Sequence, residues 1–270
     1  MKLLKNPRIS LSLIIIVASL VTGIFAPLIA PYDPLKQDFI SNLGSPSQEH
    51  LLGTDEFGRD VLSRLIFGAR VSLRVAFVSV ALAMILGTFL GLTGGYLGGW
   101  WELIAMRGSD VLLSLPPILL AMAAVAFLGS SLLNLTLIIG VLYTPRFARV
   151  VHAAVVREKN QDYIESQRAL GAGIPRILLQ GILPNILAPI MVQASLSLGF
   201  AILLEAGLSF LGLGAPPPHP SWGNMISTAR GYMRQAPYLV ISPSITIALI
   251  VLAFNTLGDG LRDSLDPRLK

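Results

Sequence analysis

The sequence contains no cysteine and has few charged residues. Because none of its 270 residues is cysteine, disulfides, thiolate chemistry and cysteine-based zinc sites are excluded. Charged residues make up 13% of the chain, well below the roughly 25% that is usual in soluble domains. Hydrophobic residues make up 53%, and the mean hydropathy is +0.70. This composition predicts an integral membrane protein.

The sequence also lacks the motifs of common active sites. No lysine follows a glycine, so the chain has no phosphate-binding P-loop. There is no H-E-x-x-H or G-x-S-x-G motif, and His50, His152 and His219 lie outside the apolar runs. The net charge of +5 is scattered among apolar runs and forms no patch for nucleic acid. We therefore expect a non-catalytic chain that binds no metal, no cofactor and no nucleic acid.

Long apolar runs predict an all-α membrane protein with six transmembrane helices. A spanning helix needs roughly 20 apolar residues, and runs without charge cover residues 9–32, 75–101, 111–145, 177–204 and 235–258. The third run is long enough for two spans and is interrupted at Gly129, Ser130 and Ser131. A cleaved signal peptide is the alternative for the first run. That run is longer than the roughly 7–15 residues of a signal core and ends in a poor cleavage site, so we expect a retained helix.

The positions of lysine and arginine predict the orientation. These residues accumulate in cytoplasmic segments. With the N-terminus inside, thirteen of them lie on the inner side and seven on the outer side. We therefore expect both termini to be cytoplasmic, together with the segment at about residues 157–183.

The segment of about residues 33–74 is expected on the outer side and is unusually long. Val61, Leu62, Leu65 and Ile66 recur at helical spacing, with Arg59, Asp60, Ser63 and Arg64 opposite them. This pattern predicts an amphipathic helix that lies at the outer interface and leads into the second span. Plain connection, partner contact and plugging of the path remain open for this segment and for residues 214–238.

Several glycines lie in or just after the second predicted span. Small residues allow two helices to approach closely, and here we expect contact with a partner subunit. These glycines are Gly87, Gly91, Gly94, Gly95, Gly98 and Gly99.

The stretch "IESQRALGAGIPRILLQGILPN" places charges and helix breakers between apolar runs. Tyr163, Ile164, Gln167 and Leu170 share one face of a short helix. Gly171 and Gly173 end it, because glycine permits the positive φ that a chain reversal needs. Pro175 suits the first turn of a second short helix, and Pro184 is expected to begin the next span. We predict a helix–turn–helix across the cytoplasmic mouth, with apolar side chains toward the bundle. An ordinary amphipathic loop is the alternative.

This stretch resembles the EAA loop of ABC importer permeases, whose pattern is roughly E-A-A-x-x-x-G, nine residues, I-x-L-P. Glu165, Gly171, Leu183 and Pro184 match it, Ser166 and Gln167 replace the two alanines, and Gly181 stands at the isoleucine. Four further stretches resemble the C-type subunit of the dipeptide, oligopeptide and nickel permeases. They are "HLLGTDEFGRDVLSRLIFGARVSL", "GGYLGGWWELIAMRGSDVLLSLPP", "LSFLGLGAPPPHPSWGNMI" and "LAFNTLGDGLRDSLDPRLK".

The resemblance implies a type I ABC importer permease fold. It implies an N-terminal helix and extracytoplasmic segment over residues 1–70 and a permease core with five transmembrane helices over residues 71–270. The implied partners are a homologous permease as heterodimer, two ABC ATPase subunits that use ATP and Mg²⁺, and an extracytoplasmic solute-binding protein. The implied location is the bacterial or archaeal cytoplasmic membrane, with the lipid bilayer as surroundings.

In that family the EAA loop is a coupling helix that binds a groove of the ATPase subunit, and its motion opens the path alternately to each side. The coupling residues that we carry over are Glu165, Ser166, Arg168, Ala169, Leu170, Gly171, Pro175 and Pro184.

Glu205 is the one acid deep in a predicted span. Such groups are costly in lipid and face a bundle interior or a cavity. It is our candidate for the substrate path, as a contact for a peptide amino group or in an interhelical pair. A structural hydrogen bond is the alternative.

The resemblance favours an importer permease for dipeptides or oligopeptides. A nickel chelate, glutathione or another small solute is the alternative substrate. A proton-coupled secondary transporter is the rival of another class, although such proteins normally carry several intramembrane charges. A non-transporting membrane scaffold is the fourth hypothesis.

Overall fold

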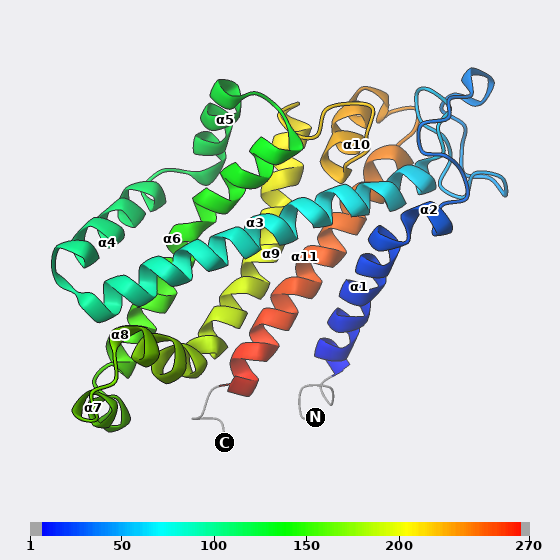
Figure 1. Ribbon diagram of the computed structural model, residues 1–270. Helices are drawn as coiled ribbons and strands as arrows, with labels where there is room; N and C mark the ends of the chain where they lie inside the picture. The colour runs from blue at the N-terminus through cyan, green and yellow to red at the C-terminus, as the bar shows by residue number, and fades with distance from the viewer. Residues whose placement is uncertain (1–6, 266–270) are drawn as a thin grey trace.

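The computed structural model describes residues 7–265, which fold into a bundle of helices without a β-strand (Figure 1). Within this range, five helices are long and apolar enough to cross a membrane, or six if a bent pair forms one span. The α-helices in chain order are α1 (Pro7–Ile24), α2 (Ala26–Ile29), α3 (Val61–Leu97), α4 (Gly99–Leu113), α5 (Pro117–Leu128), α6 (Leu132–Glu158), α7 (Asp162–Ala169), α8 (Ile174–Arg176), α9 (Leu187–Phe210), α10 (Trp222–Ala229) and α11 (Tyr238–Leu265).

The long helix α3 runs diagonally across the face seen in Figure 1. Asp60 caps its start by accepting a hydrogen bond from the Ser63 backbone N–H at 2.7 Å, and Gly98, with φ of 70°, ends it. Its 37 residues span about 55 Å, well beyond the roughly 30 Å of a hydrocarbon core. The predicted helix at residues 61–66 does lead into the second span, as the first turns of the same continuous helix. The predicted polar face is buried, because Arg59 and Arg64 pair with acids of the preceding loop.

The most extensive helix–helix contact among the described residues joins α3 to α6. A Cβ atom added to Gly91 would lie 2.6 Å from Val151 Cβ, and one added to Gly95 would lie 2.9 Å from Val155 Cβ. Gly87 meets Phe147 in the same way. For Gly87, Gly91 and Gly95 the expectation of contact with a partner subunit is wrong, because α6 already fills their side of α3.

The third apolar run, residues 111–145, is interrupted twice in the structure. The expected interruption at residues 129–131 is confirmed: Gly129 has φ of 85°, and the Ser131 hydroxyl caps α6 by accepting from the Asn134 N–H at 3.0 Å. A second interruption at residues 114–116 was not predicted, and it bends α4 and α5 by 93°. Pro116 and Pro117 explain the bend, since proline lacks the N–H that would continue the helix.

The start of α1, the end of α11 and the short helix α7 lie at the same end of the molecule (Figure 1). The loop before α3 and helix α10 lie at the opposite end. Between these ends, α8 continues through a π-helix at Ile177–Ile182 and a 3-10 turn at Leu183–Ile186 into α9. Pro184 lies in that turn, so the run begins at Ile174, before the position expected from the sequence.

Candidate functional site

The candidate coupling segment, residues 162–186, contains α7, a glycine turn and the start of the α8–α9 run. Asp162 and Glu165 occupy the first turn of α7 and Arg168 its last, which is the charge order that a helix dipole favours. Gly171 has φ of 78°, and the Ala172 N–H donates to the Gln167 carbonyl at 3.0 Å. This glycine-ended reversal is the one expected from the sequence.

The inner face of α7 packs on the π-helix. Ile164 is fully buried, and a Cβ atom at Gly181 would lie 3.0 Å from Ile164 Cδ1 and 2.7 Å from Gln167 Oε1. Gln167 and Gly181, two of the departures from the EAA pattern, therefore face each other. The larger side chain at 167 occupies the space that the missing side chain at 181 leaves.

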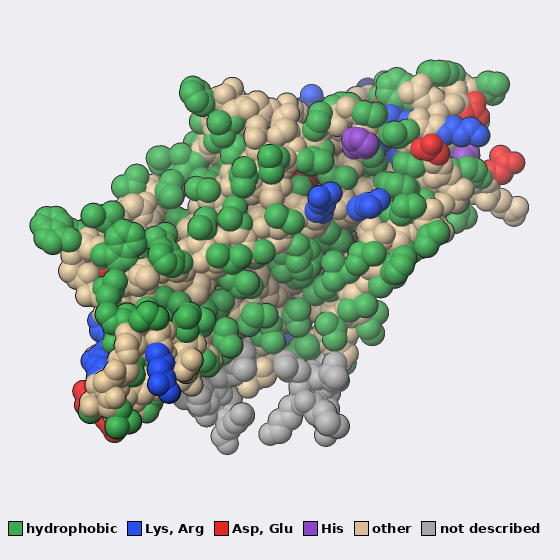
Figure 2. Space-filling model, viewed as in Figure 1, with side chains coloured by type: hydrophobic (Ala, Val, Ile, Leu, Met, Phe, Trp, Pro, Cys, Tyr) green, Lys and Arg blue, Asp and Glu red, His purple; other side chains and the backbone are tan. Residues whose placement is uncertain are grey.

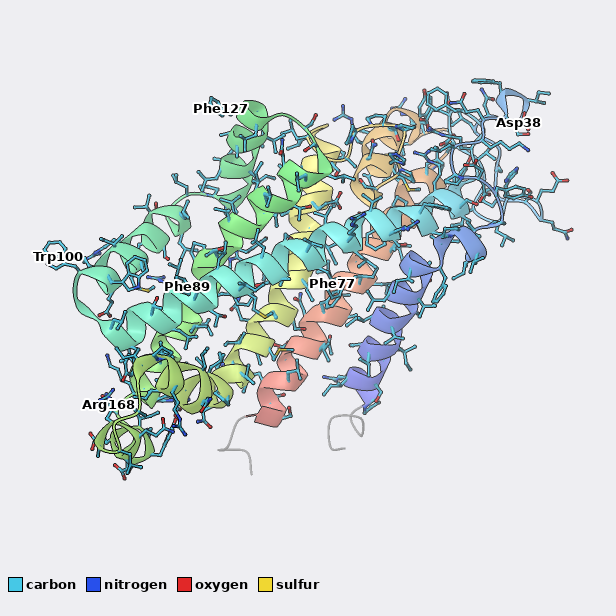
Figure 3. The ribbon with its side chains drawn as sticks, viewed as in Figure 1. Asp38, Phe77, Phe89, Trp100, Phe127 and Arg168 are labelled. Carbon is cyan, nitrogen blue, oxygen red and sulfur yellow. The ribbon has the colours of Figure 1, made fainter. Side chains whose placement is uncertain are left out.

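Arg168 ties α7 to the end of α3. Its Nε donates to the Tyr96 hydroxyl at 3.3 Å, and its guanidinium lies 5.2 Å from the centre of the Tyr96 ring. It also donates to the Lys159 carbonyl at 3.4 Å, and Lys159 Nζ donates to the Gly95 carbonyl at 2.8 Å. Figure 3 shows Arg168 at the α7 end of the molecule.

A second set of hydrogen bonds joins α7 to the neighbouring turns. The Tyr163 hydroxyl donates to Glu158 Oε2 at 2.8 Å and accepts from Asn185 Nδ2 at 3.1 Å. Asn185 Nδ2 also donates to the Gly181 carbonyl at 2.8 Å. Burial raises the pKa of the Tyr163 phenol, and the hydrogen bond to Glu158 raises it further. Partners as far apart in sequence as Tyr96 and Arg168 give no local signal, so sequence reasoning missed them.

The outer face of α7 is exposed. Glu165, Ser166, Ala169 and Gly171 are on the surface, and Leu170 has 87% of its area exposed. The Glu165 carboxylate makes no hydrogen bond or ion pair with any residue of the described range 7–265. The expectation that Leu170 shares the inner face with Ile164 is wrong, because the helix ends at Ala169 and the chain turns outward. Acidic and basic side chains gather at this end of the molecule (Figure 2).

The two prolines of the segment lie on its second half. Pro175 occupies the first turn of α8, as expected, and Pro184 lies in the 3-10 turn before α9. Both are exposed. Between them the chain is one continuous helical run, so α8 joins α9 without an intervening loop.

Glu205 lies near the far end of this run, in a buried joint between α9, α3 and α10. Its side chain is fully buried, and Oε1 accepts from the Ser209 hydroxyl at 2.7 Å. Ser72 of α3 and Ser221, which caps α10, approach the same carboxyl group. Oε2 has no hydrogen-bond partner within residues 7–265. Contact with a substrate at this position requires that α10 move away from α3 and α9.

Comparison with known proteins places these features in a family. Residues 65–270 match the profile of binding-protein-dependent transport system inner membrane components. Residues 1–46 match that of the N-terminal transmembrane domain of oligopeptide transport permease C.

Three relatives match nearly the whole chain. A dipeptide transport system permease of Alkalihalophilus pseudofirmus is 45% identical, over 100% of this chain and 88% of its own length. The dipeptide permease of Haemophilus influenzae is 47% identical, over 98% and 92%. A glutathione transport system permease of Pectobacterium atrosepticum is 46% identical, over 91% and 82%.

One solved structure shares the fold. A chain of the inward-facing MetNI methionine ABC transporter superposes with a TM-score of 0.57 at 20% sequence identity. The match covers 73% of this chain and 96% of that one.

Proposed function

The chain belongs to the binding-protein-dependent transport system inner membrane components, and from this premise we propose that it is a permease subunit of an ATP-driven importer of short peptides. The relatives named as dipeptide permeases support the substrate class. The relative named as a glutathione permease supports glutathione, itself a small peptide, as the second candidate. A proton-coupled secondary transporter finds no support in this family.

The coupling role rests on one observation: the inner face of α7 packs against the rest of the chain, and its outer face is exposed. Ile164, Gln167 and Arg168 attach it to the π-helix and to α3. Glu165 and Leu170 project an acid and an apolar side chain with no partner in the described chain. A surface of this kind suits a groove on a separate ATPase subunit, which supplies ATP and Mg²⁺ chemistry.

The helical run from Ile174 to Phe210 then transmits the motion of α7 toward the other end of the molecule. It runs for 37 residues from the α7 end, and Glu205 lies near its other end. ATP-driven displacement of α7 moves this run and, through the joint, α10 at the outer end. With a homologous permease the chain forms half of the translocation path, which accepts solute from an extracytoplasmic binding protein.

The arrangement in the membrane follows from the same proposal. The α7 end lies in the cytoplasm together with both termini, and the loop before α3 faces the binding protein. The bent pair α4 and α5 makes the third of six spans. The membrane is the bacterial or archaeal cytoplasmic membrane. Glu205 belongs to the substrate path when α10 moves.

The test uses the intact complex purified through this chain and reconstituted in vesicles. We expect a second permease and two ATPases to copurify, and we expect dipeptides or tripeptides to stimulate ATP hydrolysis in the presence of the binding protein. Leu170→Ala and Glu165→Ala should each abolish most of that stimulation. Leu133→Ala is the matched control, because Leu133 is also exposed, at 67%, but lies on α6 away from α7.

Two outcomes contradict the proposal in different ways. If glutathione or a nickel chelate stimulates ATP hydrolysis and no other peptide does, the proposed substrate is wrong but the coupling role stands. Solute transport by a complex that contains no ATPase subunit overturns the importer itself.

A further inference from the structure

Two arginines on the outer half of α3 have no counter-charge. Arg70 and Arg74 are both exposed, and neither makes a hydrogen bond or ion pair with any residue in the described range 7–265. Their neighbours toward the start of the helix behave differently. Arg59 lies 2.7 Å from Asp55 and 3.2 Å from Glu56, and Arg64 lies 3.2 Å from Asp55. Figure 2 shows basic side chains over the outer half of α3 on the viewed face.

The spacing of the pair suits one shared ligand. Residues four apart on a helix have Cβ atoms roughly 5–6 Å apart on the same face. Two guanidinium groups at that separation can approach a single carboxylate from two sides, and each offers a planar fork of N–H donors. Charges left facing lipid within a span are costly, so this turn of α3 requires water or an anionic ligand.

A pocket opens one turn above the pair. It has a volume of about 520 Å³ and is lined by apolar, proline and ring side chains that include Phe67, Tyr32 and His219. Phe67 is one helical turn before Arg70, so the pocket wall and the arginines follow one another along α3. Asp33 is the one charged residue in the lining, and the arginines lie beyond the pocket along α3. A cavity of this size is typical of a small-molecule site.

We propose that Arg70 and Arg74 form a carboxylate-binding site at the outer mouth of the path, and that this site receives the C-terminal carboxylate of the incoming peptide. This inference rests on the proposed function. The pocket accommodates the apolar part of the peptide, and the arginines select its anionic end. Beyond Arg74 the exposed stripe of α3 turns apolar at Val78, Ile85 and Phe89. The arginine pair therefore attracts the anionic end of the peptide before the peptide reaches the apolar stretch of α3.

The absence of cysteine allows a direct test in the complete reconstituted complex. Val78→Cys places one thiol a turn beyond Arg74, at a position that is 51% exposed. Its modification is followed on this subunit with an anionic sulfonatoethyl and a cationic trimethylammonioethyl thiosulfonate. We expect the arginines to favour the anionic reagent on the order of tenfold. The ratio should fall to about one when Arg70→Gln and Arg74→Gln are added. Free dipeptide should slow the modification, and the same dipeptide with a C-terminal amide should not.

The chain provides a matched control pair. Arg230 and Arg234 are also exposed and four residues apart, but they lie after α10. Arg230→Gln with Arg234→Gln should leave the reagent ratio unchanged. Vesicles made only of phosphatidylcholine, compared with vesicles that contain phosphatidylglycerol, separate a peptide carboxylate from a lipid phosphate.

Each possible result of the labelling experiment either supports or overturns the inference. No reaction with either reagent places the stripe in lipid and overturns the inference. A ratio that the Arg70 and Arg74 variants leave unchanged also overturns it, as does equal protection by the amide. A ratio that follows the lipid composition with no protection by peptide assigns the pair to lipid headgroups instead. Peptide-stimulated ATP hydrolysis in the same vesicles tests the proposed function separately. If it persists while the labelling prediction fails, only this inference falls.

Discussion

The outer segment (residues 30–60) and the coupling segment (residues 162–186) both carry charged residues between apolar helices, yet their acidic side chains have opposite surroundings. In the outer segment, Asp55 is nearly buried and pairs with Arg59 and Arg64. In the coupling segment, Glu165 has no partner in the described chain and Leu170 is almost fully exposed. Polar groups that are satisfied within the chain stabilise its structure, whereas the exposed Glu165 and Leu170 remain available for the proposed contact with an ATPase subunit.

The glycines of the two segments repeat this contrast. Gly58 and Gly171 both have positive φ, at 69° and 78°. A Cβ atom at Gly58 would collide with the backbone carbonyl of Asp38, whereas one at Gly171 would meet no atom within 4 Å. One turn is therefore closed by packing, and the other is open.

The largest effect on stability is expected from Asp55→Ala in the outer segment. It leaves Arg59 and Arg64 buried without their main partner, and breaking a buried ion pair from one side costs about 3–5 kcal/mol. Thermal unfolding of the purified complex in detergent measures the loss. Glu49→Ala is the control, because Glu49 is an exposed acid of the same segment. Equal melting temperatures for the two variants would mean that the outer segment is not held by its ion pairs.

Alanine substitutions at the two positive-φ glycines should distinguish the cost of backbone strain from the cost of a steric collision. Gly171→Ala adds only backbone strain, of about 1 kcal/mol. Gly58→Ala adds a collision to a similar strain, and overpacking costs a further 1–3 kcal/mol or so. We expect the Gly58 variant to unfold at the lower denaturant concentration. The reverse order would show that the outer turn relaxes more easily than its packing indicates.

The facing pair Gln167 and Gly181 should show an energetic coupling between two substitutions. Gly181→Ile should collide with Gln167, and Gln167→Ala should leave a gap beside Ile164. In the double variant the two changes complement each other, so the summed destabilisation should fall by roughly 0.5–3 kcal/mol. A double-mutant cycle in the assembled complex measures this coupling. Strict additivity would show that the two side chains do not share one space.

Sequence patterns anticipated the features that depend on neighbouring residues. The break at Gly129 and Ser131, the helix at residues 162–169 and the reversal at Gly171 all follow from local chemistry that is visible in the printed chain. The bend at residues 114–116 also had a local cause in Pro116 and Pro117. It escaped prediction because the run around it is uniformly apolar, and hydrophobicity alone does not separate a straight span from a broken one.

Other features depended on contacts between distant residues. Whether residues 59–66 lie on a membrane surface or inside the protein was decided by Asp55, which pairs with two arginines of the same region. Whether the glycines of α3 meet a partner or this chain was decided by α6, about sixty residues later. The direction of Leu170 was decided by the exact residue at which α7 ends.

The sequence by itself determined that the chain is a multi-span helical membrane protein with a charged, broken helix between two apolar runs. Apolar length, glycine conformations and proline positions are local properties, and they act before any long-range contact forms. The tertiary structure alone decided which charges are satisfied internally and which remain open. That outcome depends on the partners that folding brings together, such as Tyr96 with Arg168 and Gln167 with Gly181. The unpaired side chains, Arg70 and Arg74 of α3 and Glu165 of α7, could therefore be identified only from the tertiary structure.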